Sequence, residues 1–374
     1  MIAALGAGNA VVLKPSELAP ASEALLCDLI GRYLDPAAVR CVRGGVAQAT
    51  ELLAQRFDVI MYTGGPGVAR VVMAAAAKHL TPVLLELGGK NPVFVDASAN
   101  LDAAARAILR GRFTNAGQMC IAPEYVLVEA SVEEALVARL QAVAAQMFGA
   151  DPRASASYGR MVSGAHWRRV RALLEGAGGS CVVGGAAGAD EGSLYLPPTV
   201  IREPAADAAI WREEVFGPIL CTRRVADVEE AIRTINAGEK PLCLYIFSSS
   251  SSAISAILAR TSAGGVTVND TMLHPTVNPE LPFGGVGMSG MGAYHGRFGF
   301  EAFSHRKPVF RAYSWFNVVG LFMDPPYYAG QERVLSALLR YVPTHLLPVS
   351  VKDGLIVGLL AAVIGMGLRM TGRI

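Results

Sequence analysis

Glu86 and Cys120 carry side chains that could together form and then hydrolyse an acyl intermediate. Glu86 lies in the segment 85–90 (LELGGK), and Cys120 ends the segment 115–120 (NAGQMC). A thiolate is a covalent nucleophile, and a carboxylate can activate water as a general base. The pair therefore suggests the oxidation of an aldehyde to an acid.

Each of the two residues also has an ordinary structural interpretation. Free cysteines are usually small buried hydrophobic residues, and only exposed thiols with a low pKa react. At Cys120, however, Ala116 and Gly117 allow a sharp turn that brings amide N–H groups beside the sulfur. Glu86 could be a solvated surface carboxylate, but it follows the apolar run 82–85 and precedes two glycines. A carboxylate that ends a buried strand at a glycine turn is a candidate base.

The elements that must position this pair alternate between strand and helix patterns. Apolar runs bounded by turn residues predict strands at 9–13, 38–42, 58–62, 125–128 and 182–183. Helical spacing predicts helices at 20–33, 68–78, 101–112, 132–147, 170–175 and 254–260, the last of them capped by the serine run 248–252. The apolar side of helix 20–33 carries Leu25, Leu26, Leu29 and Ile30. This alternation predicts an α/β fold.

A glycine turn at 63–67 (TGGPG) joins the strand 58–62 to the helix 68–78. A strand, a glycine turn and a helix can form a nucleotide pocket, because the N-terminus of a helix receives phosphate groups. The glycine spacing does not match G-x-G-x-x-G, so a purely structural turn is an equal alternative.

Length, charge and cysteine pattern restrict the class of protein. At 374 residues the chain can form more than one domain with a sizeable core. The formal net charge of +2, without basic runs, gives no support for nucleic acid as a partner. The six cysteines, at 27, 41, 120, 181, 221 and 243, show neither CxxC nor metal-ligand spacing. We therefore predict free thiols in a reducing compartment and no metal site.

Five segments together resemble the aldehyde dehydrogenase superfamily. They are 8–17 (GNAVVLKPSE), 85–90 (LELGGK), 117–120 (GQMC), 214–218 (EVFGP) and 281–285 (LPFGG). Five matches in register make an accidental likeness implausible. The segments 75–89 and 289–296 (SGMGAYHG) further resemble the class 3, fatty aldehyde dehydrogenase branch.

The resemblance implies an aldehyde dehydrogenase-like α/β fold in several parts. The expected parts are an incomplete, Rossmann-type NAD-binding domain at 1–87, an α/β catalytic domain at 88–283, a return to the core at 284–310, a C-terminal collar at 311–349 and a membrane anchor at 350–374. A full-length member would form a homodimer.

The resemblance also implies roles for the catalytic pair. The Cys120 thiolate would attack an aliphatic aldehyde and form a thiohemiacetal, whose oxyanion is held by the Cys120 backbone N–H and a side-chain amide. Hydride transfer to a nicotinamide would leave a thioester on Cys120. Glu86 would then activate water and release the acid. Acylating relatives that use coenzyme A lack this carboxylate, so Glu86 argues against acyl transfer.

Five residues would bind the cofactor according to the resemblance. Lys14 and Glu17 would contact the adenosine ribose, and Gly64 would lie in the cofactor-facing turn. Glu214 would bind the nicotinamide ribose, and Phe216 would pack beside the ring. The carboxylate of Glu17 suits ribose hydroxyls and repels a 2′-phosphate, so we expect NAD, with NADP as a second cofactor that class 3 members often accept. Outside its motif, Glu214 would be read as an exposed surface carboxylate.

Three single positions qualify the match. Asn269 resembles a family asparagine near the catalytic turn, where a structural hydrogen-bonding role is an equal alternative. Ala69 stands where the family usually has the final glycine of the cofactor turn, and Met288 stands where relatives have a polar residue.

The start of the chain departs further from the family pattern. It matches what the family treats as the middle of the nucleotide domain, so the first strands, the N-terminal helices and an oxyanion-donating asparagine are expected to be missing. Loss of one such donor costs about a hundredfold or more in rate. The chain is then either an N-terminally truncated version of an active enzyme or an inactive, membrane-tethered scaffold derived from the same fold.

An uncharged apolar run, 354–368, lies close to the C-terminus. It is shorter than the roughly twenty residues that span a bilayer, but Arg369 can extend it by snorkelling. A docked core helix is the alternative to a membrane anchor. The resemblance favours a tail anchor in the endoplasmic reticulum with the catalytic part in the cytosol. The N-terminus lacks the pattern of a secretory signal.

Overall fold

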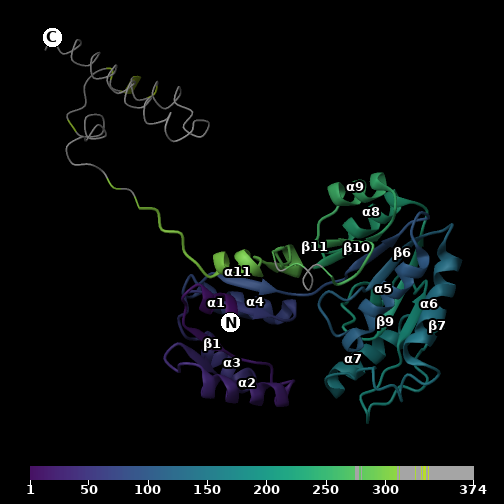
Figure 1. Ribbon diagram of the computed structural model, residues 1–374, viewed down its shortest axis with the longest axis horizontal. Coiled ribbons are helices and arrows are strands. Elements are labelled where there is room, and N and C mark those ends of the chain that lie inside the picture. Colours follow the sequence, from purple (N-terminus) through teal and green to yellow (C-terminus); the bar gives the residue numbers. More distant parts are fainter. Residues whose placement is uncertain are drawn as a thin grey trace. The chain divides into compact units, whose positions relative to one another are not determined.

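The computed structural model describes residues 1–273, 278, 280–309, 311, 325, 330, 332–333 and 336. The chain divides into two compact units, Met1–His305 and Arg306–Ile374. All helices and strands with assigned bounds belong to the first unit, where they can be followed by label and colour in Figure 1. Helices and strands alternate along most of this unit, so the fold is α/β as predicted.

The N-terminal part consists of short strands and helices. Its elements are α1 (Ile2–Gly6), β1 (Val11–Leu13), α2 (Pro20–Tyr33), β2 (Val39–Cys41), α3 (Val46–Leu53), β3 (Ile60–Thr63), α4 (Pro66–Ala77) and β4 (Val83–Glu86). β1 pairs in parallel with β2, and β3 pairs in parallel with β4. The two pairs belong to separate sheets, and β12 (Gly290–Met291) extends the second by running antiparallel to β4. β4 is thus held on both sides up to its last residue, Glu86.

The central part of the described chain is built on a seven-stranded sheet with the order β11-β10-β5-β6-β9-β8-β7. Its strands are β5 (Pro92–Val95), β6 (Tyr125–Glu129), β7 (Ser180–Val183), β8 (Thr199–Arg202), β9 (Ile219–Val225), β10 (Cys243–Phe247) and β11 (Gly265–Val268). The connecting helices are α5 (Leu101–Phe113), α6 (Glu133–Phe148), α7 (Gly164–Glu175), α8 (Val228–Ala237) and α9 (Ser251–Arg260). Short 3₁₀ turns are η1 (Thr114–Gly117), η2 (Ala209–Trp211) and η3 (Gly287–Ser289). Neighbouring strands are parallel except for the edge strand β7, which is antiparallel to β8.

Both faces of this sheet are buried. Val93 and Val95 of β5 belong to a core cluster with α5 and α6, whereas Phe94 between them packs with residues of α7, α8 and α9. Successive side chains of a strand point to opposite faces, so helices on both sides remove the whole strand from water. The sheet therefore forms a rigid support for the loops at its ends.

The segment that follows residue 283 returns to the N-terminal part. Its helix α11 (Gly296–Ala302) packs on α1, and a side chain on Gly299 would come within 3.0 Å of the Ala3 Cβ atom. The Asn9 side chain also donates a hydrogen bond to the backbone oxygen of Phe303 at 2.9 Å. Two helices far apart in the sequence, α1 and α11, therefore lie side by side (Figure 1).

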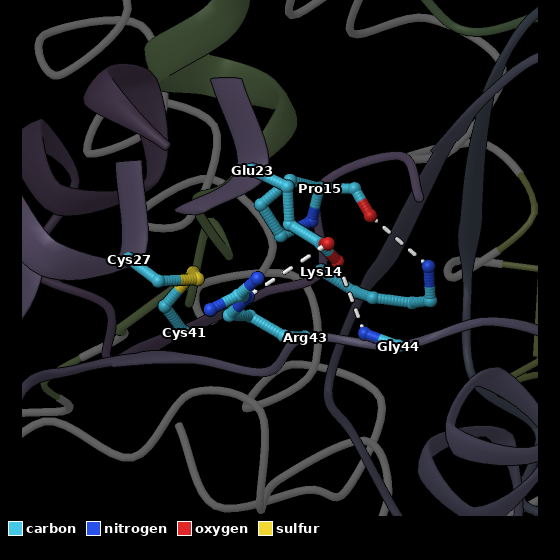
Figure 2. Close-up of a disulfide and its surroundings, with 7 residues drawn as sticks. All are labelled: Lys14, Pro15, Glu23, Cys27, Cys41, Arg43 and Gly44. Atoms are coloured by element: carbon cyan, nitrogen blue, oxygen red, sulfur yellow. Dashed lines mark hydrogen bonds and ion pairs between the residues drawn. A yellow bond between two sulfur atoms is a disulfide. The ribbon is translucent and has the colours of Figure 1, made fainter. Parts of the chain in front are cut away.

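One prediction from the cysteine pattern is wrong. Cys27 of α2 and Cys41 of β2 form a disulfide, with Cα atoms 5.2 Å apart, although the sequence predicts free thiols. Figure 2 shows a second connection beside it, in which Glu23 accepts a hydrogen bond from the Gly44 N–H at 3.0 Å and lies 3.8 Å from Arg43. Disulfide pairing depends on distance in space, which sequence spacing alone does not give. The remaining cysteines, Cys120, Cys181, Cys221 and Cys243, are free.

Helix α2 has the predicted bounds but not the predicted burial. Ile30 is buried, whereas Leu25, Leu26 and Leu29 are 57%, 42% and 40% exposed. Helical spacing identifies an apolar side but does not determine which element covers it.

Other expected elements occur with shifted ends. The helix predicted at 170–175 is the second half of α7, which starts earlier because Ser163 caps it by accepting a hydrogen bond from the His166 N–H. The serine run caps α9 as predicted, since Ser250 accepts from the Ala253 N–H at 3.3 Å. Caps decide where a helix begins, and they are weaker signals than apolar spacing.

Two further predictions concern membranes and metals. Within the described part of the chain, no helix is both long enough and apolar enough to cross a membrane, and no group of three or more acidic, cysteine or histidine residues is placed to bind a metal ion. The predicted anchor at 350–374 and almost all of the collar at 311–349 lie outside the described residues.

Candidate active site

The turn that carries Cys120 has an unusual backbone. Asn115, Ala116 and Gly117 have φ angles of 52°, 52° and 74°, three consecutive residues in the left-handed region. Such a conformation is costly for residues other than glycine and persists where the surrounding structure imposes it. Gly117 packs so closely on the Gly217 carbonyl group that a Cβ atom there would overlap it. The turn is therefore fixed by its neighbours rather than by its own preferences.

Asn91 holds the backbone on the other side of Cys120. Its side-chain amide donates to the Cys120 and Ala122 carbonyl oxygens at 2.8 and 3.0 Å, and its oxygen accepts from the Cys243 N–H at 2.9 Å. Asn91 is 1% exposed, so these three hydrogen bonds satisfy a polar group that would be costly to bury alone. They join the Cys120 turn to β10.

The Cys120 thiol is partly exposed. Burial, together with the nearby carboxylates of Glu214 and Glu86, raises the pKa of this thiol to about 11. Hydrogen bonding with the backbone of Cys120 and Ile121 acts in the opposite direction. The thiol is therefore mostly protonated at neutral pH in the cofactor-free protein, and its ionisation responds to both acidic side chains.

Glu86 ends β4 with its carboxyl group buried. The residue is 3% exposed, and neither carboxylate oxygen has a hydrogen-bond partner among the residues that the structure describes. Burial raises the pKa of Glu86 to about 8. Its backbone oxygen accepts from the Gly64 N–H at 3.0 Å, and Gly290 of β12 lies opposite in the sheet. A buried, unpaired carboxyl group with a pKa near neutrality has the properties of a general base.

Glu214 lies against the glycine turn that follows Glu86. Its carboxylate accepts a hydrogen bond from the Gly89 N–H at 3.2 Å, and a Cβ atom on Gly88 would be 2.6 Å from the Glu214 carboxyl carbon. Only glycine at position 88 leaves room for this approach. Burial, followed by the charge of Glu124, raises the pKa of Glu214 to about 7. The structure thus brings Glu86 and Glu214 close enough to Cys120 for both carboxylates to raise the pKa of its thiol.

The remaining residues expected from the resemblance lie in different surroundings. Lys14 and Glu17 follow β1 and form an ion pair of 3.0 Å. The sheet that contains β1 shares no strand with the sheet that contains Glu86. Gly64 lies in the turn between β3 and α4, beside the Tyr62 ring. Phe216 has a left-handed backbone with φ of 45°.

Asn269 makes structural hydrogen bonds in this chain. Its side-chain oxygen accepts from the Ser248 N–H, and its nitrogen donates to the Ser248 carbonyl oxygen, both at 3.0 Å. These bonds join the ends of β10 and β11, which matches the structural alternative considered for this residue.

An aromatic cluster near Glu86 and Cys120 had no predicted role. Tyr294 lies edge-on to Phe283 and His295, with ring centroids 5.8 and 4.4 Å apart, and Phe283 and His295 stack at 5.3 Å. The pKa of Tyr294 is raised by burial and then by the charges of Glu86 and Cys120, which places the phenol near both. In the sequence these residues lie in the segments 281–285 and 289–296, which resemble the family. Their spacing gives no sign that their rings come into contact.

A buried group of charges also lacks any clear sequence signal. Glu124 is 2.7 Å from both the Lys90 ammonium group and the Arg112 guanidinium group. Burial disfavours its charge, but the two cations hold the pKa of Glu124 at about 2. Arg112 is fully buried at the end of α5, a position where a surface charge would normally be assumed.

Comparison with known proteins places this arrangement in a family. A model of the aldehyde dehydrogenase family matches residues 1–309. The chain belongs to the aldehyde dehydrogenase family. It is 47% identical over 308 residues to rat aldehyde dehydrogenase family 3 member A2, a match that covers 82% of this chain and 63% of the relative. It is 48% identical to the rat dimeric NADP-preferring aldehyde dehydrogenase, covering 82% of this chain and 67% of that one.

Solved structures of aldehyde dehydrogenases give the same assignment. The substrate-bound state of Staphylococcus aureus AldH matches with a TM-score of 0.84 and 39% identity, over 90% of this chain and 72% of that one. The chain spans less than two thirds of the rat family 3 member A2 relative. Within that shared part, the aldehyde dehydrogenase motifs are the segments that supply Glu86, Cys120 and Glu214.

Proposed function

We propose that the protein oxidises aliphatic aldehydes, including long-chain ones, to carboxylic acids with NAD or NADP as the hydride acceptor. The observation that carries this proposal is the pairing of a partly exposed cysteine, Cys120, with a buried carboxyl group, Glu86, that has no hydrogen-bond partner within the described part of the chain. The family match supports the reaction type, and the resemblance of segments 75–89 and 289–296 to the fatty aldehyde dehydrogenase branch supports aliphatic substrates.

The side chains of this site can carry out the steps in order. The Cys120 thiol gives its proton to water, and the thiolate sulfur attacks the carbonyl carbon to form a thiohemiacetal. The backbone N–H groups beside the sulfur can stabilise the oxyanion. After the loss of hydride, a thioester remains on Cys120. Glu86 removes a proton from a water molecule, which attacks the thioester, releases the acid and restores the thiol.

The residues expected to bind the cofactor fit a dinucleotide. α4 begins after Gly65, which has no side chain to cap the helix, and Pro66 has no N–H, so the Gly67 and Val68 N–H groups of the first turn are the ones that could meet a phosphate. Lys14 and Glu17 offer a cation and a carboxylate to the adenosine ribose, and Glu214 offers a carboxylate to the nicotinamide ribose. When bound, the nicotinamide supplies the acceptor for the hydride. Glu17 favours NAD, while one relative is named NADP-preferring.

Assembly and membrane attachment are further parts of the proposal. One relative is named dimeric, and we expect this protein to be a homodimer in its full-length form. The apolar run 354–368 would anchor the C-terminus in the endoplasmic reticulum membrane, with the catalytic part in the cytosol.

The test is aldehyde oxidation by the full chain with hexanal and hexadecanal, followed as absorbance of the reduced cofactor. Cys120→Ser should abolish turnover, because a hydroxyl is a much weaker nucleophile than a thiolate. Cys181→Ser is the matched control, since Cys181 is an exposed free cysteine remote in sequence from the motifs. If the unmodified chain does not oxidise aldehydes and its Cys120 does not react with iodoacetamide, the scaffold alternative replaces the enzyme.

A further inference from the structure

Glu124 is a buried carboxylate on which several segments of the site converge. It is 2% exposed and lies between the Cys120 turn and β6. One carboxylate oxygen accepts from Lys90 Nζ at 2.7 Å and from the Val215 N–H at 2.9 Å. The other accepts from Arg112 Nη1 at 2.7 Å. A carboxylate with three donors is well satisfied, and all three come from different parts of the chain.

Each donor belongs to a segment that the proposed reaction needs. Lys90 ends the turn Gly88–Lys90, which follows Glu86. Val215 lies between Glu214 and Phe216, the two residues expected beside the nicotinamide. Arg112 also donates to the Gly217 carbonyl oxygen, the same oxygen on which Gly117 of the Cys120 turn packs. The hydrogen bonds of Glu124 therefore join the turn 88–90, which follows the proposed base Glu86, to the segment 214–217, which is expected to contact the nicotinamide.

The charge of Glu124 also acts on the site. It contributes to the raised pKa of Glu214, which Lys90 and Arg112 oppose. The charges that raise the pKa of the Cys120 thiol are those of Glu214 and Glu86, so Glu124 acts on the thiol only indirectly, through Glu214. Without Glu124, the positive charges of Lys90 and Arg112 would act on Glu214 without its opposing negative charge. Glu124 therefore influences Glu214 by its charge as well as by the hydrogen bonds that hold the segments in place.

We infer that Glu124 is a positioning residue that holds the segment 214–217 against the turn 88–90 and so prepares the nicotinamide side of the site. The inference rests on the proposed function. The Cys120 turn has its own support from Asn91, so Glu124 should affect cofactor binding and hydride transfer more than the reactivity of the thiol. This separation distinguishes positioning from a purely structural buried ion pair.

The experiment compares two reactions of the full chain. Aldehyde oxidation needs the nicotinamide side, whereas hydrolysis of 4-nitrophenyl acetate needs only the nucleophile and the base, because this ester already has the oxidation level of an acid. Glu124→Gln should raise KM for NAD about tenfold, as expected for the loss of a charge-assisted hydrogen bond, and leave ester hydrolysis within about twofold of the unmodified protein. Glu124→Asp, which keeps the charge, should recover part of the loss.

Glu133→Gln is the matched control. Glu133 is also 2% exposed, and it pairs with both Arg202 Nε and Nη2 at 2.8 Å, between α6 and β8. Both variants should lower the melting temperature, but only Glu124→Gln should change KM for NAD. If the two variants lose stability alike and neither changes KM, Glu124 is structural only and the inference is overturned.

A second variant covers the case in which Glu124→Gln does not fold. Lys90→Met leaves Glu124 paired one to one with Arg112 and removes only the connection to the turn 88–90. It should also raise KM for NAD, and a folded Lys90→Met protein with unchanged KM would contradict the inference. NAD affinity measured by calorimetry reports the effect without turnover, so an inactive unmodified chain that still binds NAD would refute the proposed function alone.

Discussion

At the scale of single residues, the site depends on acidic groups that are buried together. Glu86 and Glu214 have pKa values of about 8 and 7, and the Cys120 thiol has a pKa of about 11. Burial raises the pKa values of both carboxyl groups, and their negative charges help to raise the pKa of the thiol, so Glu86 and Cys120 are mostly protonated at pH 7 while Glu214 is partly ionised. The proposed nucleophile and base therefore gain their reactive forms only as the pH rises or as bound groups change this balance.

A pH profile tests the assignment of Glu86. A general base acts when ionised, so the rate of thioester hydrolysis should rise with pH up to about 8, where Glu86 ionises. Glu86→Gln should remove both this limb and nearly all turnover while Cys120 remains open to alkylation. Stopped-flow absorbance checks this prediction: the variant should show a burst of reduced cofactor followed by slow thioester hydrolysis. An unchanged steady-state rate in the variant would exclude Glu86 as the base.

The free energy of unfolding should also depend on the ionisation of Glu86, but it should fall with rising pH where the hydrolysis rate rises. The folded-state pKa of about 8 lies above the ordinary value of 4.5, so between these pH values the folded protein holds a proton that the unfolded chain has released. The free energy of unfolding should fall as pH rises through this window, by about 1.4 kcal/mol per unit at most from this one group. Urea titrations at pH 5 and pH 8 should show a smaller difference for Glu86→Gln than for the unmodified protein.

At the scale of elements, close packing between glycine turns positions the site. Gly88→Ala would force the new Cβ atom into the Glu214 carboxylate, so the Glu214 side chain would have to move away from the turn after β4. We expect a loss of activity of about a hundredfold, because small displacements of reacting groups have effects of this size. Gly31→Ala in α2 is the control, since a Cβ atom there meets nothing within 4 Å, and alanine should stabilise the helix slightly. Equal activity of both variants would show that the contact between Gly88 and Glu214 does not matter.

The disulfide between α2 and β2 should stabilise the N-terminal part. Its cysteines are separated by 14 positions, and closing a loop of this length contributes about 3 kcal/mol in the chain-entropy model. Reduction, or the double substitution Cys27→Ala and Cys41→Ala, should therefore lower the midpoint of chemical unfolding. Mass spectrometry of the alkylated protein, with and without reductant, decides whether the bond is present. Alkylation of both cysteines without reductant would contradict the pairing.

At the scale of the whole molecule, the sequence predicts that the C-terminal segment holds the enzyme on a membrane. Deletion of residues 350–374 should release the protein to the soluble fraction, because the apolar run 354–368 would be lost. Turnover of hexanal should be unchanged, since Glu86, Cys120 and Glu214 lie in the unit Met1–His305. Flotation of the two forms with liposomes gives the measurement, and a deletion variant that still floats would refute the anchor.

The sequence by itself determined the class of fold, the family resemblance and the types of residue that could do the chemistry. These follow from local patterns: apolar spacing predicts α2 and α5 almost to the residue, and short motifs identify Glu86 and Cys120. Such patterns work because neighbouring residues fix backbone conformation and burial over a few positions.

Only the tertiary structure decided which distant residues meet. It paired Cys27 with Cys41, left three leucines of α2 exposed and brought Tyr294 near Glu86 and Cys120. It also buried Glu124 between Lys90 and Arg112, which sequence reading would leave on the surface. The physical reason is that pKa shifts, disulfides and buried ion pairs depend on distances between segments, and the packing of sheets and helices sets those distances.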